Sequence, residues 1–160
     1  MADVVEHHLA QINVARPKAA LDDPVMSGFV SAMARIGQLA SNSRGFVWQP
    51  GDGDPITSDG LVVNLSVWTG FEALHEFVYR SRHGSFVRRR DHWFVPMDQP
   101  STALWWVPVG ERPTVEDGLR RLAVLRRQGP SPQAFGLPQA AGAPPPPSPA
   151  PDPGAAAPRP

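Results

Sequence analysis

The chain has 160 residues, and its 15 lysines and arginines balance its 15 acidic residues, so the formal net charge is zero. A dedicated nucleic-acid binder usually carries a basic excess that neutralises phosphates, so nucleic acid is not an expected partner. The absence of cysteine excludes disulfides, a thiol nucleophile and thiolate metal ligands.

The N-terminal segment "MADVVEHHLAQINVA" has no basic region followed by an apolar run, so no signal peptide is expected. No apolar run approaches the roughly 20 residues that span a bilayer. We therefore predict a cytoplasmic protein without a membrane partner.

The first predicted elements are a strand and a helix. Residues 8–15 ("HLAQINVA") alternate in the manner of a strand. Asp23 is a suitable N-cap, with Pro24 at the first helical position. The apolar residues that follow fall on one helical stripe, namely Met26, Phe29, Val30, Met33 and Ile36.

Two further strands are expected on either side of a loop. Residues 45–49 ("GFVWQ") predict a short strand, and the Gly, Asp and Pro content of residues 50–60 predicts a loop. Residues 61–68 ("LVVNLSVW") give the clearest strand. One face of it holds Leu61, Val63, Leu65 and Val67, and the other holds Val62, Asn64, Ser66 and Trp68.

The second half repeats the order helix, strand, helix. Residues 69–83 predict a helix, which continues as a second helical segment after Gly84. Residues 102–110 predict a strand in which Trp105 and Trp106 point to opposite faces. Thr114 and Asp117 resemble a capping box at the start of the last helix, which the glycine and proline after it close.

Residues 129–160 are rich in Pro, Ala and Gly, and from about Leu137 they lack apolar periodicity. Such a segment cannot bury enough surface to offset the entropy of ordering, so residues 137–160 are expected to be a disordered tail. The folded domain is then residues 1–136.

The order β-α-β-β-α-β with a terminal helix predicts an α+β, ferredoxin-like fold with helices on one face of an antiparallel sheet. The odd-numbered face of residues 61–68 is expected to meet those helices. The opposite face has the composition of a ligand cavity or a wet interface. Its predicted members are Gln11, Asn13, Trp48, Asn64, Ser66 and Trp68. We assign all of them except Gln11 to ligand binding.

The blocks "LAQINVARPKAALDDPVMSGFV", "LVVNLSVWTGFEALHEFVYRSRHGSFVRRRDHWF" and "LWWVPVGERPTVEDGLRRLAVLRRQGPSPQAF" resemble domain-of-unknown-function family 3291. That family is similar to the dimeric α/β-barrel superfamily, which includes the antibiotic-biosynthesis monooxygenases. The resemblance implies a homodimer in which two subunits pack their open sheet faces together and each encloses a cavity. An exposed sheet face holding Trp48 and Trp68 would also be an unusually large apolar patch on a monomer.

The segment "VWTGFEALHEFVYRSRH" matches a pattern common in monooxygenase-like dimeric barrels, with a histidine at the helix end. A histidine near a cavity could move a proton near neutral pH, so His83 and Tyr79, one turn apart, are the candidate catalytic residues. Arg80 could hold an anionic substrate. The structural alternative is that His83 only caps its helix.

The arginines of "RRRDHW" point in successive directions about 100° apart, so at most one of them can face a cavity. Their simpler interpretation is a solvated helix face, and substitution of Arg89 or Arg90 is expected to be milder than that of His83 or Tyr79. No metal site is predicted, because His75, His83 and His92 lack a known ligand spacing. No dinucleotide fingerprint or hydrolase elbow is present either.

Two function classes remain open. One is a cofactor-independent, monooxygenase-like enzyme acting on a small aromatic or polyketide-like molecule. The other is a non-catalytic homodimer that binds a small molecule or has a structural role. Haem binding through His83 is a weaker third possibility, and no cofactor is predicted.

Overall fold

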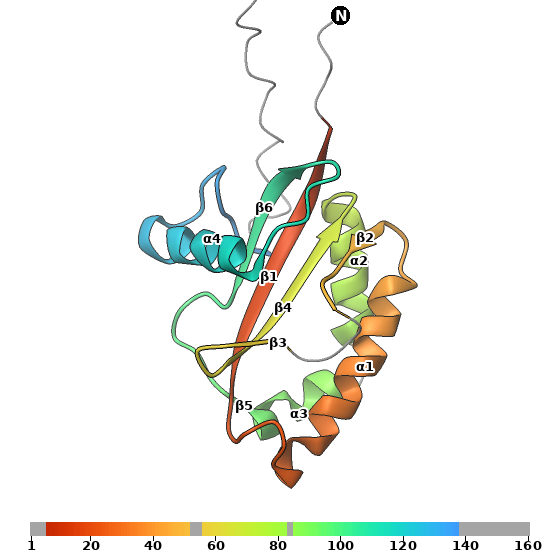
Figure 1. Ribbon diagram of the computed structural model, residues 1–160, viewed down its shortest axis with the longest axis vertical. Coiled ribbons are helices and arrows are strands. Elements are labelled where there is room, and N and C mark those ends of the chain that lie inside the picture. The colour runs from red at the N-terminus through yellow and green to blue at the C-terminus, as the bar shows by residue number, and fades with distance from the viewer. Residues whose placement is uncertain (1–5, 52–55, 83–84, 138–160) are drawn as a thin grey trace, which may run out of the picture.

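The computed structural model describes residues 6–51, 56–82 and 85–137 (Figure 1). For residues 81, 82 and 85–88 it describes the backbone alone. Over these ranges the chain is an α+β structure in which an antiparallel sheet of six strands packs between helices. Its helices are α1 (Ser27–Ser41), α2 (Phe71–Arg82), α3 (Ser85–Trp93) and α4 (Val115–Gln128), and a 3₁₀ turn, η1 (Pro24–Met26), precedes α1.

The sheet is built around one central strand. The strands are β1 (His7–Pro17), β2 (Phe46–Trp48), β3 (Ile56–Ser58), β4 (Leu61–Trp68), β5 (Phe94–Val95) and β6 (Thr102–Pro108). β1 pairs with β4 along one edge and with β6 and β5 along the other, always antiparallel. β2 and β3 both pair with the outer edge of β4.

The helix-start signals in the sequence are confirmed. The side chain of Asp23 accepts a hydrogen bond from the Val25 N–H at 2.9 Å, as an N-cap does. Thr114 and Asp117 form a reciprocal capping box on α4. The N–H of Thr114 is the main cause that lowers the pKa of Asp117, because a hydrogen bond to a carboxylate favours its charged form.

Two elements differ from the sequence prediction. β3 lies inside residues 50–60, which were expected to be a loop, and forms a hairpin with β4 through Asp59 and Gly60. Both turn residues have positive φ, 49° and 74°, which is the requirement of a type I′ turn and the reason Asp-Gly favours it. Residues 52–55 lie outside the described part of the chain. The second difference is at the end of α3, where Phe94 leaves the helix to pair with Pro17 as β5.

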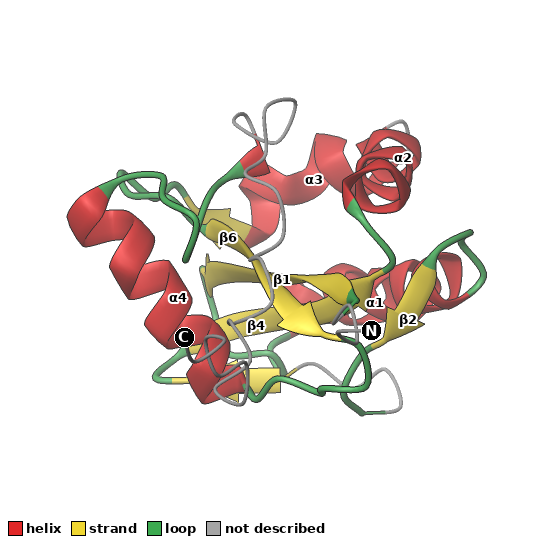
Figure 2. Ribbon diagram, turned by 90° about the horizontal axis from the view of Figure 1, so that it is seen from above, coloured by secondary structure: helices red, strands yellow, loops and turns green. Residues whose placement is uncertain are grey.

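The odd-numbered face of β4 does not meet α1 and α2, so that expectation is wrong. Its residues pack instead with α4, which lies on the opposite side of the sheet from α2 and α3 (Figure 2). We call this side the α4 face. Its buried core residues are Ala10, Ile12, Val14, Val63, Leu65, Val67, Ala103, Trp105 and Val107, covered by Leu122 and Leu125 of α4.

The sheet positions that point the other way form the cavity face, which α1, α2 and α3 cover. Trp68 lies on this face and is fully buried against Leu74. Trp48 packs on the α4 face instead, where the Arg112 guanidinium lies over its ring, so the expectation that Trp48 and Trp68 share a face is wrong. The bulge in the pairing of β2 with β4 accounts for the discrepancy, because it breaks the regular alternation on which the expectation relied.

The positions of the two tryptophans do not support a dimer. Trp68 is buried on the cavity face and Trp48 packs on the α4 face, so the two do not form one exposed apolar patch. Trp105 and Trp106 do lie on opposite faces, as expected from strand geometry.

The end of the described chain returns to the sheet. The backbones of Leu104 and Phe135 exchange two hydrogen bonds, of 2.7 and 3.0 Å, along the outer edge of β6. Phe135 is buried against Trp106 on the cavity face. Among the described residues, no helix is long and apolar enough to cross a bilayer.

A test of the α4 packing is the substitution Gly118→Ala. A Cβ atom at Gly118 would lie 2.6 Å from Ile12 Cδ1, inside the buried contact between α4 and β1. The helix-propensity gain of about 1 kcal/mol should be outweighed by overpacking of about 1–3 kcal/mol, so the free energy of unfolding should fall. Urea unfolding measures it. The penalty should shrink in an Ile12→Val background, which lacks Cδ1, whereas a stabilised single variant would contradict this packing.

Candidate functional site

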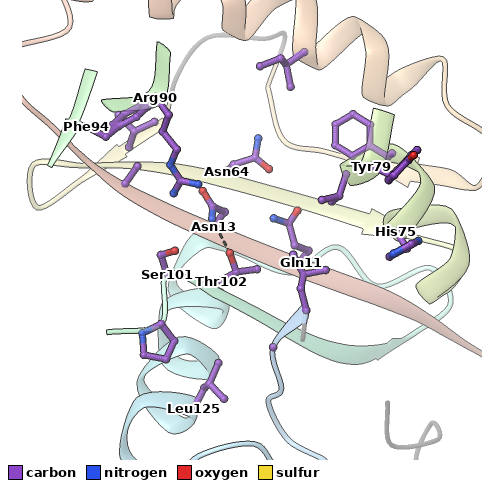
Figure 3. Close-up of a pocket in the computed structure, with 18 of the residues that line it drawn as sticks. Gln11, Asn13, Asn64, His75, Tyr79, Arg90, Phe94, Ser101, Thr102 and Leu125 are labelled. Atoms are coloured by element: carbon purple, nitrogen blue, oxygen red, sulfur yellow. Dashed lines mark hydrogen bonds between the residues drawn. The ribbon is translucent and has the colours of Figure 1, made fainter. Parts of the chain in front are cut away.

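A cavity of about 1240 Å³ lies over the cavity face of the sheet and continues past β6 toward the C-terminal end of α4. Its floor is formed by β1 and β4, and α1, α2 and α3 supply walls. Figure 3 shows 18 of the residues that line the cavity as sticks. The polar members of the lining are Gln11, Asn13, Asn64, His75, Tyr79, Arg90, Ser101 and Thr102.

Strand register gathers the polar side chains on the floor. Asn13 on β1 stands opposite Asn64 on β4 and opposite Thr102 on β6. Gln11, two residues earlier on β1, stands opposite Ser66. Residues two apart on a strand share a face, so these groups form a polar strip across three strands.

A chain of hydrogen bonds behind the floor orients Gln11. The indole Nε1–H of Trp68 donates to Ser66 Oγ at 2.9 Å, and the Ser66 hydroxyl donates to Gln11 Oε1 at 2.8 Å. Since an indole can only donate, this direction of donation leaves the Gln11 carbonyl oxygen as the acceptor. The Gln11 NH₂ group forms no hydrogen bond with the described residues and is a free donor on the cavity floor.

The other end of the strip is organised around Asn13. Its Nδ2 donates to Thr102 Oγ1 at 2.7 Å, which leaves the Asn13 carbonyl oxygen available. The guanidinium group of Arg90 reaches from α3 toward Asn13 (Figure 3). Within the described ranges Arg90 forms no ion pair, and the described cavity lining contains no carboxylate. The described lining therefore combines neutral amides with the guanidinium group of Arg90, a solvent-exposed residue, and no carboxylate.

The remaining walls are apolar and partly aromatic. Phe29 and Met33 of α1 and Phe77 and Val78 of α2 line the cavity. Phe77 stacks on Trp68 with ring centroids 4.9 Å apart, so the indole that starts the hydrogen-bond chain also supports a wall. Phe29 meets Phe94 edge to face at 4.8 Å. Such walls suit a flat apolar ligand.

The structure separates the residues that were assigned to a site. Asn13 and Asn64 line the cavity, whereas Ser66 and Trp68 are buried beneath its floor and act through Gln11. Trp48 lies on the α4 face and does not contribute to the described lining. These five ligand-binding assignments remain predictions as far as a bound molecule is concerned.

The helix residues assigned to the site also lie in different places, some in the cavity lining and some on the surface. Tyr79 lines the cavity but is 60% exposed, which places it at the rim. Arg80 is not in the described lining, because its guanidinium pairs with Glu76 one turn earlier at 2.7 Å on the surface. His83 lies outside the described residues. Of the two arginines of α3 whose side chains are described, Arg90 lines the cavity and Arg89 does not. The side chain of Arg88 lies outside the described part, so it stays a prediction that at most one arginine faces inward.

Several lining residues were absent from the predicted site, among them Arg90, Thr102 and His75. Arg90 was assigned to a solvated helix face, and it is exposed to solvent as well as part of the lining. Thr102 could have been found, because its alternation with Leu104 and Trp106 places it on the same face of β6. His75, on an exposed turn of α2, carries no local sequence signal. Within the described ranges no three potential metal ligands cluster together.

The sequence profile of the family described as Domain of unknown function (DUF3291) matches residues 8–149. The chain therefore belongs to this family. Neither the curated proteins nor the solved structures contain a significant match to the chain.

The hydrogen-bond chain under the cavity floor can be tested with Ser66→Ala. This change leaves the buried Trp68 N–H without its acceptor and should lower the free energy of unfolding by about 1–3 kcal/mol. In a Trp68→Phe background, which has no N–H to satisfy, the cost of Ser66→Ala should be smaller. Equal costs in both backgrounds, measured by chemical denaturation, would show that the Trp68–Ser66 bond contributes little.

Proposed function

We propose that this protein binds a small, largely apolar molecule in the cavity between the sheet and helices α1–α3. The observation that carries the proposal is the polar strip on the cavity floor, which includes Gln11, Asn13 and Asn64, beside apolar and aromatic side chains from α1 and α2. Ligand sites combine these features, since apolar walls supply affinity and a few placed polar groups supply orientation.

Hydrogen-bonding supports the same conclusion. Gln11 and Asn13 each use one end of the amide within the protein and leave the other end toward the cavity. Asn64, opposite Asn13, forms no side-chain hydrogen bond with the described residues. Buried or half-buried amides normally find partners, so these groups favour a cavity that holds a polar ligand or ordered water.

A second proposal is catalysis of the monooxygenase-like kind, without a cofactor, on a small aromatic or polyketide-like molecule. The strand order β6-β1-β4-β2 supports a ferredoxin-like fold of the dimeric α/β-barrel superfamily. Amide donors at the cavity floor could stabilise negative charge that develops on a substrate oxygen. Tyr79 at the rim is the described candidate for proton transfer, together with His83. A non-catalytic binding protein uses the same cavity and needs no proton transfer.

Ligand binding is tested with a thermal-shift screen of small aromatic and polyketide-like compounds, followed by titration of the hits. Ala15→Phe places a bulky ring on the cavity floor two residues from Asn13 and should weaken binding at least about tenfold, which corresponds to a loss of about 1.4 kcal/mol of binding free energy. Ala123→Phe, an exposed position on α4, is the matched control and should leave binding unchanged. Hits that bind both variants equally would place the site elsewhere. Oxygen uptake with the hits then separates an enzyme from a binding protein, and a Soret band in the purified protein would indicate haem.

A homodimer remains a proposal that now rests on the superfamily resemblance alone. Sedimentation at micromolar concentration should give twice the chain mass of 17.3 kDa. A monomer in this experiment would refute the dimer and leave the cavity within a single chain untouched.

A further inference from the structure

Two hydrogen-bonding positions of different chemistry lie on the cavity floor at a fixed spacing. Gln11 and Asn13 are two residues apart on β1, which separates their Cα atoms by about 7 Å at the usual rise of a strand. Both positions are held by pairing on each side of β1, with β4 and with β6. A ligand that contacts both would need polar groups at a similar separation.

The end of the cavity at Asn13 favours a negative charge. Arg90 extends toward Asn13 (Figure 3), and no acid in the described lining balances it. The carboxylates that pair with arginine in the described chain, Glu76 and Asp117, are bound to Arg80 and Arg120. A guanidinium group can hold a carboxylate through two parallel hydrogen bonds, and the adjacent Asn64 amide can donate another.

The end at Gln11 favours a neutral acceptor. The Ser66 hydroxyl donates to Gln11 Oε1, so the Gln11 NH₂ group is presented as a donor. Gln11 is only 9% exposed, which makes an unmatched donor there costly. A ketone, quinone or amide oxygen on the ligand would satisfy it, whereas an alkyl group would leave it unpaired.

We propose that the cavity selects aromatic carboxylates that carry a carbonyl oxygen at the far side of the ring. The carboxylate binds Arg90 and Asn64, the carbonyl accepts from the Gln11 NH₂ group, and the ring lies against the aromatic and aliphatic wall that includes Phe29 and Phe77. This inference rests on the proposed function, because it names the class of ligand for the same cavity.

Three closely matched probes test it by isothermal titration. 4-Acetylbenzoate has both groups, 4-acetylbenzamide lacks the charge, and 4-isopropylbenzoate replaces the ketone by an alkyl group of similar shape. Removal of the charge should weaken binding about 10- to 100-fold and removal of the ketone about 2- to 10-fold, as expected for a charged and a neutral hydrogen bond. Equal affinity for all three would refute the two-point selection while leaving the cavity as a binding site. Failure of all three to bind at millimolar concentration would refute this ligand class, whereas the thermal-shift screen decides separately whether the cavity binds another small molecule.

Two variants test which residue binds the carboxylate and which binds the ketone of the probe. Arg90→Gln should remove the preference for 4-acetylbenzoate over its amide, and Arg89→Gln is the matched control on the same helix, outside the described lining. Gln11→Met should remove the preference for the ketone over the isopropyl group and keep the preference for charge. Because each readout is a ratio between two ligands on one folded variant, a general loss of stability does not imitate it. Unchanged ratios in Arg90→Gln or in Gln11→Met would overturn the assignment.

Discussion

The architecture depends on the pairing of β1 along both of its edges. Antiparallel hydrogen bonds to β4 and to β6 fix the register of three strands at once, and a shift by one residue would exchange the two faces of β1. With this register Ile12 lies under α4, and Gln11 and Asn13 face the other helices. The site is therefore a direct consequence of how the central strand is held.

That register also explains why amides occur in the interior of a small domain. The α4 face of the sheet is almost wholly apolar and closely packed, to the point that Gly118 leaves no room for a side chain against Ile12. The cavity face has apolar ends, at Trp68 and at Phe94, and a polar middle. The apolar contacts that stabilise the fold are concentrated in the α4 face and at the two ends of the cavity face, so the polar middle is not needed for core packing. The hydrogen-bond chain from Trp68 links the apolar core to the cavity floor, because the same indole packs in the core and orients Gln11 through Ser66.

Much of the fold could be predicted because its signals are local. Alternation identified β1, β4 and β6 to within a few residues, and the capping box at Thr114 located the start of α4. The Asp59-Gly60 hairpin is also a local signal, and it was available in the sequence although the segment was assigned to a loop. Asn13 and Asn64 were identified for the same reason, since a polar residue within a strand stands out from its neighbours.

The sequence by itself determined which residues share a strand face and where the helices begin, because period-two alternation and capping depend on neighbours in the chain. Only the tertiary structure decided which face each helix covers. Alternation is symmetric with respect to the two sides of a sheet, so the polar strip could have met solvent, a second subunit or helices. α4 closed the apolar side and α1–α3 enclosed the polar side. The placement of Arg90 over Asn13 likewise depends on how α3 packs across the end of the sheet, a contact between segments that are far apart in the chain.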